Sequence, residues 1–389
     1  MPSKVISSDY GLIGENLDFK KNVKVEIDGV GRIEAVSYED ITTDIRTQIN
    51  ERKSLVIPGF INSHTHIGDS FAKEAGINLD LSNVVAPPDG LKHRLLRTTQ
   101  NSIKELGIKQ ASREMLSNGI TYFVDFRENG LAGINVLKNS ILGIGISCFI
   151  LGRFSKVEDL SDVYNAADGL GFSSYKVISG DLKRKLINLK AKNHKLFASH
   201  DAEKARNDKL FEEMINDKLI DVVIHGTQYR RKELKEIKDN DISLVLCPRS
   251  NGYFGVGIPP INEIIDLEIP ISLGTDNVMA NSLDLFEEMR YLFIISRVLS
   301  KGTSKKALKS KDLLKMVTTN AARNFGITND LGSISKGKFA NFFTIELNDA
   351  NYYSHIINTD SVYPLIVQRT KSENIKRTYT GGEIVFERK

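Results

Sequence analysis

Apolar strand-like runs alternate regularly with helical stretches through the middle of the chain, and this alternation constrains the fold most. Helical periodicity lies between the runs, for instance at 202–217 and 231–239, and again after the last run and at 311–325. The eight predicted strands are residues 55–63, 120–126, 144–151, 173–179, 196–200, 220–225, 242–247 and 269–275. Strands that alternate with helices form parallel sheets, and eight such units favour an α/β fold of the closed (β/α)8 TIM barrel type.

Both ends of the chain look different from the middle. Near the N-terminus, "NVKVEIDG" alternates Val23, Val25 and Ile27 with polar residues and then turns at Asp28-Gly29, which is typical of a β-hairpin. The C-terminal segments "ANFFTIELN", "PLIVQRT" and "IKRTYTGGEIVFERK" are also predicted as strands. We therefore expect one small β-domain built from both termini, which divides the chain into residues 1–54, 55–328 and 329–389.

Histidines gather at the predicted strand ends. Barrel active sites lie at the C-terminal ends of the strands, and four of the seven histidines stand there, together with one aspartate: His64, His66, His200, His225 and Asp276. Side chains at i and i+2 of a strand leave from the same face, so His64 and His66 converge on one point. Without the other residues, a metal-binding pair and two exposed loop histidines would be equally good interpretations of His64 and His66. The remaining histidines, His93, His194 and His355, are expected in packing or surface roles.

Neutral imidazoles and a carboxylate are the ligands of a catalytic zinc ion, which keeps one position open for water. Bound zinc lowers the pKa of that water to roughly 7–9, so that hydroxide is available near neutral pH. A neighbouring carboxylate can take the proton and orient the nucleophile. The strand-end residues therefore predict a hydrolytic metal site.

This residue set resembles the amidohydrolase superfamily of metal-dependent hydrolases. The segment "PGFINSHTH" is similar to the opening motif of that superfamily, and the resemblance covers nearly the whole chain. The N-terminal strands, "LGSISKGKFANF" and "TGGEIVFERK" resemble its accessory domain. The resemblance implies that the small β-domain is a β-sandwich and that residues 55–328 form the hydrolase barrel.

Two further motifs resemble one branch of the superfamily. "HDAE" (200–203) and "CPRSN" (247–251) are similar to segments of cytosine, guanine and S-adenosylhomocysteine deaminases and of triazine hydrolases. The resemblance implies one divalent metal ion, with zinc favoured and iron as the alternative, bound by His64, His66, His200 and Asp276. It makes Glu203 the proton shuttle and His225 the group that orients the hydroxide or polarises the reacting centre. Without the motif, Glu203 would be read as a helix-start glutamate that complements the helix dipole.

The implied activity is hydrolysis of carbon–nitrogen bonds other than peptide bonds. We expect hydrolytic deamination of a purine, pyrimidine, nucleoside or related heterocycle by a metal-bound hydroxide, with Glu203 and Asp276 dividing the proton transfers. Three residues are candidates for substrate contact: Arg127, Arg249 and Asn251. Arg127 could instead pair with a neighbour such as Glu128, Arg249 could brace a loop, and Asn251 could shape the loop near the metal. Residues 68–90 form a long irregular loop that is a candidate lid.

Two rival interpretations stay open. Lys176 falls on the predicted fourth strand, where dihydroorotase-like enzymes carry a carboxylated lysine that bridges two metals, so a binuclear hydrolase of cyclic amides is one alternative. A non-catalytic scaffold of the same fold is the other, because fold alone does not license an activity. The complete set of ligand residues argues against the scaffold.

The composition excludes some partners. A net charge of +4 over 389 residues, without a dense Lys/Arg block, predicts neither a nucleic-acid nor a membrane partner, so a small-molecule substrate is expected. The two cysteines, Cys148 and Cys247, exclude a disulfide framework, and the N-terminal residues do not resemble a signal peptide, so a cytoplasmic location is expected. Superfamily members are often oligomeric; a homo-oligomer stays open, and the sequence does not indicate a number of subunits.

Overall fold

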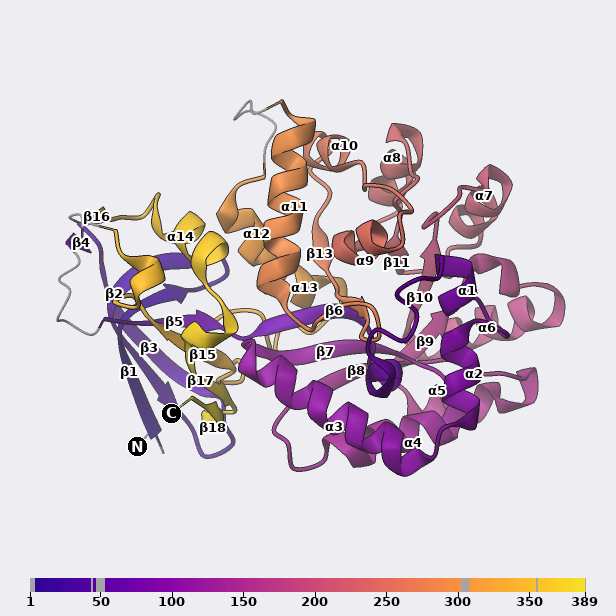
Figure 1. Ribbon diagram of the computed structural model, residues 1–389, viewed down its shortest axis with the longest axis horizontal. Coiled ribbons are helices and arrows are strands. Elements are labelled where there is room, and N and C mark those ends of the chain that lie inside the picture. The colour runs from indigo at the N-terminus through magenta and orange to yellow at the C-terminus, as the bar shows by residue number, and fades with distance from the viewer. Residues whose placement is uncertain (1–3, 43–44, 47–52, 302–307, 355, 389) are drawn as a thin grey trace.

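The computed structural model describes residues 4–42, 45–46, 53–301, 308–354 and 356–388, and these form two parts. Strands from both ends of the chain make a sheet at the left of Figure 1, where both termini lie, and the middle of the chain makes a larger unit of parallel strands and helices at the right. The prediction of an α/β barrel with a small β-domain from both termini is confirmed.

The barrel consists of parallel strands in sequence order. They are β6 (Phe60–His66), β7 (Ile120–Arg127), β8 (Ser147–Gly152), β9 (Gly169–Phe172), β10 (Leu196–Asp201), β11 (Val222–His225), β12 (Ser243–Leu246), β13 (Ile271–Leu273) and β14 (Asp276–Asn277). The last predicted strand is split, because β13 pairs with β12 whereas β14, three residues later, pairs with β6. These two pairings close the sheet into a barrel, and they bring Asp276 beside Thr65.

Helices cover the outside of the barrel. They are α3 (Asn101–Ser117), α4 (Gly130–Ile141), α5 (Leu160–Ala166), α6 (Gly180–Asn193), α7 (Asp208–Asp217), α8 (Arg231–Asp239), α9 (Pro248–Tyr253), α10 (Ile261–Asp266), α11 (Leu285–Leu299), α12 (Ser310–Met316) and α13 (Thr319–Asn324). The predicted helix over 202–217 thus begins only at Asp208, and the one over 311–325 is two short helices. None of the helices in the described part of the chain combines the length and the apolarity that a membrane span requires.

The barrel interior is filled by inward-facing side chains. Val124, Ala198, Ile224 and Val245 come from four different strands and belong to one buried cluster, which Phe325 joins just after α13. A much larger cluster lies between the strands and the surrounding helices. The barrel is therefore a packed scaffold whose strand ends are available for chemistry.

The predicted fourth strand at 173–179 is wrong. The strand is β9, which ends at Phe172, and Tyr175–Val177 form a short 3-10 helix, η3. The sequence "GLGF" of β9 has a low strand propensity because of its two glycines. Packing requires them: a Cβ on Gly169 would lie 2.2 Å from the carbonyl oxygen of Leu196, and one on Gly171 would lie 2.7 Å from the Phe126 ring. Close approach of neighbouring strands therefore overrides propensity here.

The small β-domain is one seven-stranded, mainly antiparallel sheet. Its strands are β1 (Lys4–Ile13), β2 (Asp18–Ile27), β3 (Ile33–Asp40), β5 (Ser54–Pro58), β15 (Phe342–Glu346), β17 (Ile375–Thr380) and β18 (Glu383–Glu387). The sheet coils on itself, since the turns at Gly31 and Gly381, from opposite ends of the strand order, touch each other. A buried apolar cluster of β1, β2, β5 and β15 residues fills the inside. A two-stranded sheet of β4 (Ile45–Arg46) and β16 (Ile356–Ile357) lies apart from it.

Two further sequence expectations need correction here. The predicted strand 55–63 is two strands, because β5 pairs with β1 and β15 in the small domain and β6 starts the barrel after Pro58-Gly59. The predicted strand "PLIVQRT" is instead part of helix α14 (Val362–Arg369). A short apolar run does not by itself distinguish a strand from a buried helix, which explains this error.

The loop after the first barrel strand is more regular than expected. It contains the 3-10 helix η1 (Ile67–Ala72) and the short helix α1 (Leu81–Val85), and it leads into α2 (Leu91–Thr98). These elements cover the C-terminal ends of the barrel strands, so they help to enclose the site described next.

Candidate metal centre

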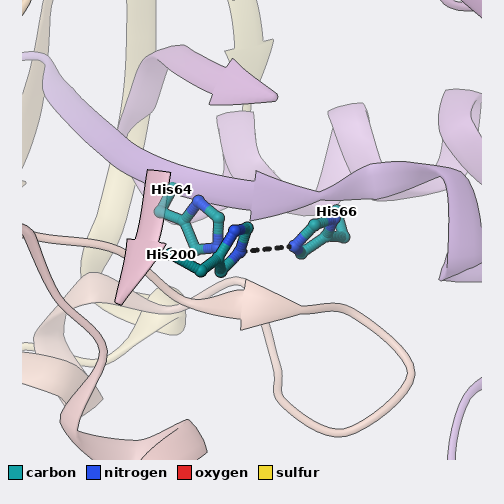
Figure 2. Close-up of side chains that lie close together, drawn as sticks. All are labelled: His64, His66 and His200. Atoms are coloured by element: carbon teal, nitrogen blue, oxygen red, sulfur yellow. Dashed lines mark hydrogen bonds between the residues drawn. The ribbon is translucent and has the colours of Figure 1, made fainter. Parts of the chain in front are cut away.

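Three of the predicted ligands converge at the barrel mouth. His64 and His66 lie on β6 and His200 lies on β10, and Figure 2 shows the three rings turned toward one another. Nitrogen atoms of these three rings lie within 4.8 Å of one another, and a second such set joins His64 with His225 and Asp276. Residues from the first, fifth, sixth and eighth strand positions are thus brought to one point.

Hydrogen bonds determine which ring nitrogens face that point. His66 Nδ1 lies 2.8 Å from Glu128 Oε1, and His200 Nδ1 lies 2.9 Å from the carbonyl oxygen of Phe172. Both partners accept, so both Nδ1 atoms carry the proton and both Nε2 atoms present lone pairs. These Nε2 atoms are only 3.3 Å apart, the contact dashed in Figure 2. A cation between them would satisfy both.

His64 gives the same indication. Its side chain is fully buried, and neither ring nitrogen has a hydrogen-bond partner within the described part of the chain. Buried polar atoms are normally paired. An unpaired imidazole 3.3 Å from Asp276 Oδ1 is expected where a metal ion completes the set.

The surroundings keep the imidazoles neutral, which is the form that binds metals. Burial lowers the pKa of His64, and it lowers the pKa of His200 well below its usual range. Burial and then the positive charge of Lys92 lower the pKa of His66 to about 3. The three rings are therefore ready to act as ligands at neutral pH.

Asp276 supplies the carboxylate. Its Oδ2 accepts a 2.6 Å hydrogen bond from Ser250 Oγ, and its Oδ1 accepts one from Asn277 Nδ2 at 3.0 Å. Burial opposes its ionisation, but the close contact with His64 and the neighbouring His225 and His66 lower the pKa of Asp276 well below its usual range. A positive backbone φ of 62° at Asp276 directs the chain from β13 into β14.

His225 and Glu203 form the second half of the site. Asn251 accepts from Thr227 Oγ1 through Oδ1, so its Nδ2 donates to His225 Nδ1 at 3.2 Å. The His225 proton then resides on Nε2, which lies 3.7 Å from Glu203 Oε2. Burial, followed by the charge of Asp276, raises the pKa of Glu203, whereas His225 opposes this rise. Burial therefore favours the protonated form of Glu203 more than water would.

A buried ionic network supports His66, and the sequence indicated only one of its contacts, the pairing of Arg127 with Glu128. Glu128 Oε1 accepts from Lys92 Nζ at 2.7 Å and lies 3.5 Å from Arg153 Nη1, while Arg127 Nη2 reaches Oε2 at 3.1 Å. These cations and His66 lower the pKa of Glu128 well below its usual range, although burial opposes the effect. The only sequence signal was that Glu128 follows the second strand. Lys92 lies on α2, and no pattern in the sequence indicated that it belongs to the site.

These groups border a cavity of about 240 Å3. The ligand candidates His66, His200 and Asp276 line its floor with Glu203 and His225, and residues of the loop before α2 line another side. Three cationic side chains also line it: Lys92, Arg153 and Lys204. A small heterocycle would therefore meet both the ligands and the acid–base pair.

None of the three predicted substrate contacts lines this cavity. Arg127 is buried, pairs with Glu128 and Asp125, and lines a different cavity. Arg249 pairs with Glu287 at 2.8 Å and contacts Ser282, so it braces the loop between β14 and α11. Asn251 contacts His225 and Thr227. The alternatives of an ion pair, a loop brace and a loop residue near the metal fit these contacts better than substrate binding does.

Lys176 cannot serve as the strand-four bridge that the sequence left open. It lies on η3, beyond the end of β9, and its side chain is exposed. The other histidines lie outside the described part of the site: His93 contacts the carbonyl oxygen of Val85, His194 ends α6, and His355 falls outside the described residues.

Comparisons with known proteins show the family to which the chain belongs. The sequence model of the amidohydrolase family matches residues 55–218 and 191–385. An uncharacterized protein of Methanocaldococcus jannaschii is 32% identical over 88% of this chain and 90% of its own length. A 5'-deoxyadenosine deaminase of Methanosphaera stadtmanae is 25% identical over 92% of this chain and 88% of its own.

A solved structure shares the fold. The crystal structure of an adenosine deaminase from Xanthomonas campestris with bound zinc superposes with a TM-score of 0.80 and 16% sequence identity. The match covers 98% of this chain and 92% of the other. The fold of the two chains therefore corresponds over nearly the whole of each.

Proposed function

The chain belongs to the amidohydrolase family and is a hydrolase of carbon–nitrogen bonds, and from this premise we propose that it deaminates a purine nucleoside or closely related heterocycle. The observation that carries the proposal is the pairing of a convergent ligand set with an acid–base pair at one cavity. Glu203 and His225 border the same space as His66, His200 and Asp276. A scaffold protein would have no use for this combination of residues.

We propose one divalent ion, zinc, held by His64, His66, His200 and Asp276. The unpaired nitrogens of His64 and the facing Nε2 atoms of His66 and His200 support the fit, and nitrogen and carboxylate ligands suit zinc. Iron remains the alternative. When bound, the ion would supply Lewis acidity that lowers the pKa of a water molecule.

Glu203 is the proposed proton shuttle. Burial raises the pKa of Glu203, which favours the protonated carboxyl, and we propose that this carboxyl donates its proton to a ring nitrogen of the substrate. Its Oε1 is buried without a hydrogen-bond partner among the described residues, and the side chain lines the cavity. An unsatisfied carboxyl oxygen facing a cavity is suited to a substrate contact.

Asp276 and His225 are the proposed partners. The carboxylate of Asp276 stays ionised and accepts a proton from the attacking water. His225, with its proton on Nε2, donates a hydrogen bond to the oxygen that is added to the substrate. Asn251 keeps His225 in this tautomer.

The proposed reaction adds water to the substrate and then releases ammonia. The water oxygen forms a bond to the ring carbon that bears the amino group, one water proton passes to Asp276, and the adjacent ring nitrogen gains the proton of Glu203. The exocyclic carbon–nitrogen bond then breaks, and the amine leaves as ammonia after it receives the proton that Asp276 took from water. The second water proton passes from the added oxygen to Glu203, which is thereby protonated again, and the oxygen becomes a carbonyl.

The substrate class rests on the relatives. One is named a 5'-deoxyadenosine deaminase, and the structural neighbour is an adenosine deaminase. A cavity of about 240 Å3 would enclose a purine base while the remainder of a nucleoside extends toward the loop before α2. Guanine, pyrimidine and cyclic amide substrates are the alternatives that a screen has to include.

The test is ammonia release from zinc-loaded protein with adenosine, 5'-deoxyadenosine, guanine, cytosine and dihydroorotate. We expect release with an adenine nucleoside and about 10²- to 10⁴-fold lower kcat in Glu203→Gln, since one general acid is lost. Glu213→Gln on exposed α7 is the matched control and should retain full activity. Hydrolysis of dihydroorotate alone would contradict deamination. No turnover of any compound by metal-loaded protein would favour the scaffold.

Other expectations also remain proposals. We propose the division into a hydrolase barrel at 55–328 flanked by small-domain segments at 1–54 and 329–389, although β5 pairs within the small domain. We also propose a cytoplasmic location, which the free thiols of Cys148 and Cys247 support. A homo-oligomer remains open, and light scattering would determine the number of subunits.

A further inference from the structure

A second cavity, of about 260 Å3, lies between α2, α3 and α4. In Figure 1, α3 and α4 run along the lower edge of the molecule, with α2 near α4. Arg127, at the end of β7, lines this cavity, and the metal-ligand candidates do not. The proposed deaminase mechanism does not use this cavity.

Its lining carries positive charge only. Arg97 of α2, Lys104 of α3 and Arg127 of β7 all line the cavity, and none of the described residues that line it is acidic. Arg97 Nη1 donates to the carbonyl oxygen of Pro88, and Lys104 Nζ donates to that of Leu96, so each retains further N–H groups. Three cations without an acidic partner in the lining favour an anionic ligand.

Two helix N-termini add to this charge. Asn101 is the first residue of the 17-residue helix α3, and Asn129 is the N-cap of the 12-residue helix α4; both line the cavity. Neither helix has a side-chain hydrogen bond at its N-cap. Uncapped N–H groups and the positive end of the helix dipole bind phosphate and similar anions.

Arg127 is the third cation of the lining. Its side chain is 3% exposed, and its Nη1 lies 3.4 Å from Asp125 Oδ2 while its Nη2 bonds Glu128. The guanidinium lies close to Gly68, which also lines the cavity, since a Cβ there would lie 1.8 Å from Nη2. The two carboxylates balance the charge of Arg127, so Arg97 and Lys104 supply the positive charge that an anion would meet.

We propose that this second cavity binds a phosphate group, either as inorganic phosphate or as the ester group of a small molecule. Arg97, Lys104 and Arg127 would contact its oxygens together with N–H groups at the starts of α3 and α4. The volume suits a small ligand rather than a nucleotide. The site is separate from the proposed deaminase cavity, so it can exist whether or not the deaminase proposal holds.

The test is calorimetric titration of the purified, metal-bound protein with inorganic phosphate at constant ionic strength. We expect saturable binding that weakens by about tenfold in Arg97→Gln and in Lys104→Gln, because each loses a charge-assisted hydrogen bond. Arg94→Gln and Lys109→Gln, on the same helices but outside the cavity lining, are the matched controls and should bind as the native protein does. Circular dichroism would establish that all variants are folded.

Titrations with other anions and with a variant of the first cavity show which cavity binds the anion and whether the anion is free phosphate or an ester. Glycerol 3-phosphate that binds as phosphate does would assign the ester, whereas binding of inorganic phosphate alone would assign the free ion; both support the proposal. Equal binding of acetate would replace phosphate by a carboxylate and overturn it. Unchanged affinity in Arg97→Gln and Lys104→Gln would overturn it, as would loss only in Lys204→Gln, which lines the first cavity. No saturable binding at all would also contradict it.

Discussion

At the scale of single residues, the candidate metal centre depends on where each imidazole proton resides. Glu128 accepts a hydrogen bond from Nδ1 of His66, and the carbonyl oxygen of Phe172 accepts one from Nδ1 of His200. The sequence could predict that these histidines meet, because strand ends share one rim. It could not predict Glu128 and Lys92 as partners, because Lys92 arrives from a helix after a loop whose path no residue pattern reveals.

Glu128 should control metal affinity without contacting the metal. In Glu128→Gln, His66 loses a charged acceptor and Lys92 loses its counter-charge, so we expect zinc affinity to fall by about 10- to 100-fold. Competition against a chelator would measure this, on protein whose folding is checked by circular dichroism. Glu213→Gln should bind zinc as the native protein does. Unchanged zinc affinity in Glu128→Gln would contradict the role of Glu128 in supporting His66 as a ligand.

Glu288 should make stability depend on pH. It is fully buried on α11, and burial, opposed by Arg249, raises the pKa of Glu288 to about 8. Its pKa in the unfolded chain is near 4.5, so the folded state binds the extra proton between these values. The contribution of Glu288 to the free energy of unfolding is therefore complete below about pH 4.5 and is lost as pH rises through about 8.

The size of that loss can be tested with Glu288→Gln, which cannot ionise. We expect the variant to gain roughly 3 to 5 kcal/mol in the free energy of unfolding, relative to the native protein, as pH rises from about 5 to about 9. Urea unfolding at several pH values would measure the difference. Parallel curves for the two proteins would show that Glu288 does not change protonation in this range.

At the scale of elements, strand ends and strand pairing decide the site. Strand six, "IDVVIH", is apolar and β-branched, and its end at His225 was predictable. Strand four was not, because Gly169 and Gly171 serve the close approach of neighbouring strands and weaken the local pattern. The displaced prediction put Lys176 on a strand and so suggested a bridging lysine, whereas the structure places Lys176 on η3 with its side chain exposed.

Asn62 should couple the first strand to the eighth. Its Nδ2 donates to Thr275 Oγ1 at 2.8 Å, and its Oδ1 accepts from Thr275 N at 3.0 Å, next to Asp276. Asn62→Ala leaves these buried groups unpaired, so we expect about 2 to 4 kcal/mol less stability together with weaker zinc binding. Urea unfolding and chelator competition would measure the two effects.

The matched control for that prediction is Asn193→Ala on the exposed surface of α6. It should change the free energy of unfolding by less than about 0.5 kcal/mol. A stability loss in Asn62→Ala without any change in zinc affinity would mean that the strand contact does not position Asp276.

At the scale of the whole molecule, the fold places chemistry on one face of a rigid barrel. The small β-domain, built from both termini, packs beside the barrel, where Phe343 of β15 contacts Phe60 and Phe286. Alternation of strands and helices predicted this architecture correctly. The loop before α2 and the second cavity could not be predicted, because both depend on how distant helices pack together.

The most direct measurement is the metal content of the purified chain, determined by elemental analysis of protein prepared without chelator. We predict one equivalent of zinc or iron per chain in the native protein, and a small fraction of that in His64→Ala. Two equivalents would contradict the single-metal site. No metal, even after zinc or iron is supplied, would contradict the catalytic proposal altogether.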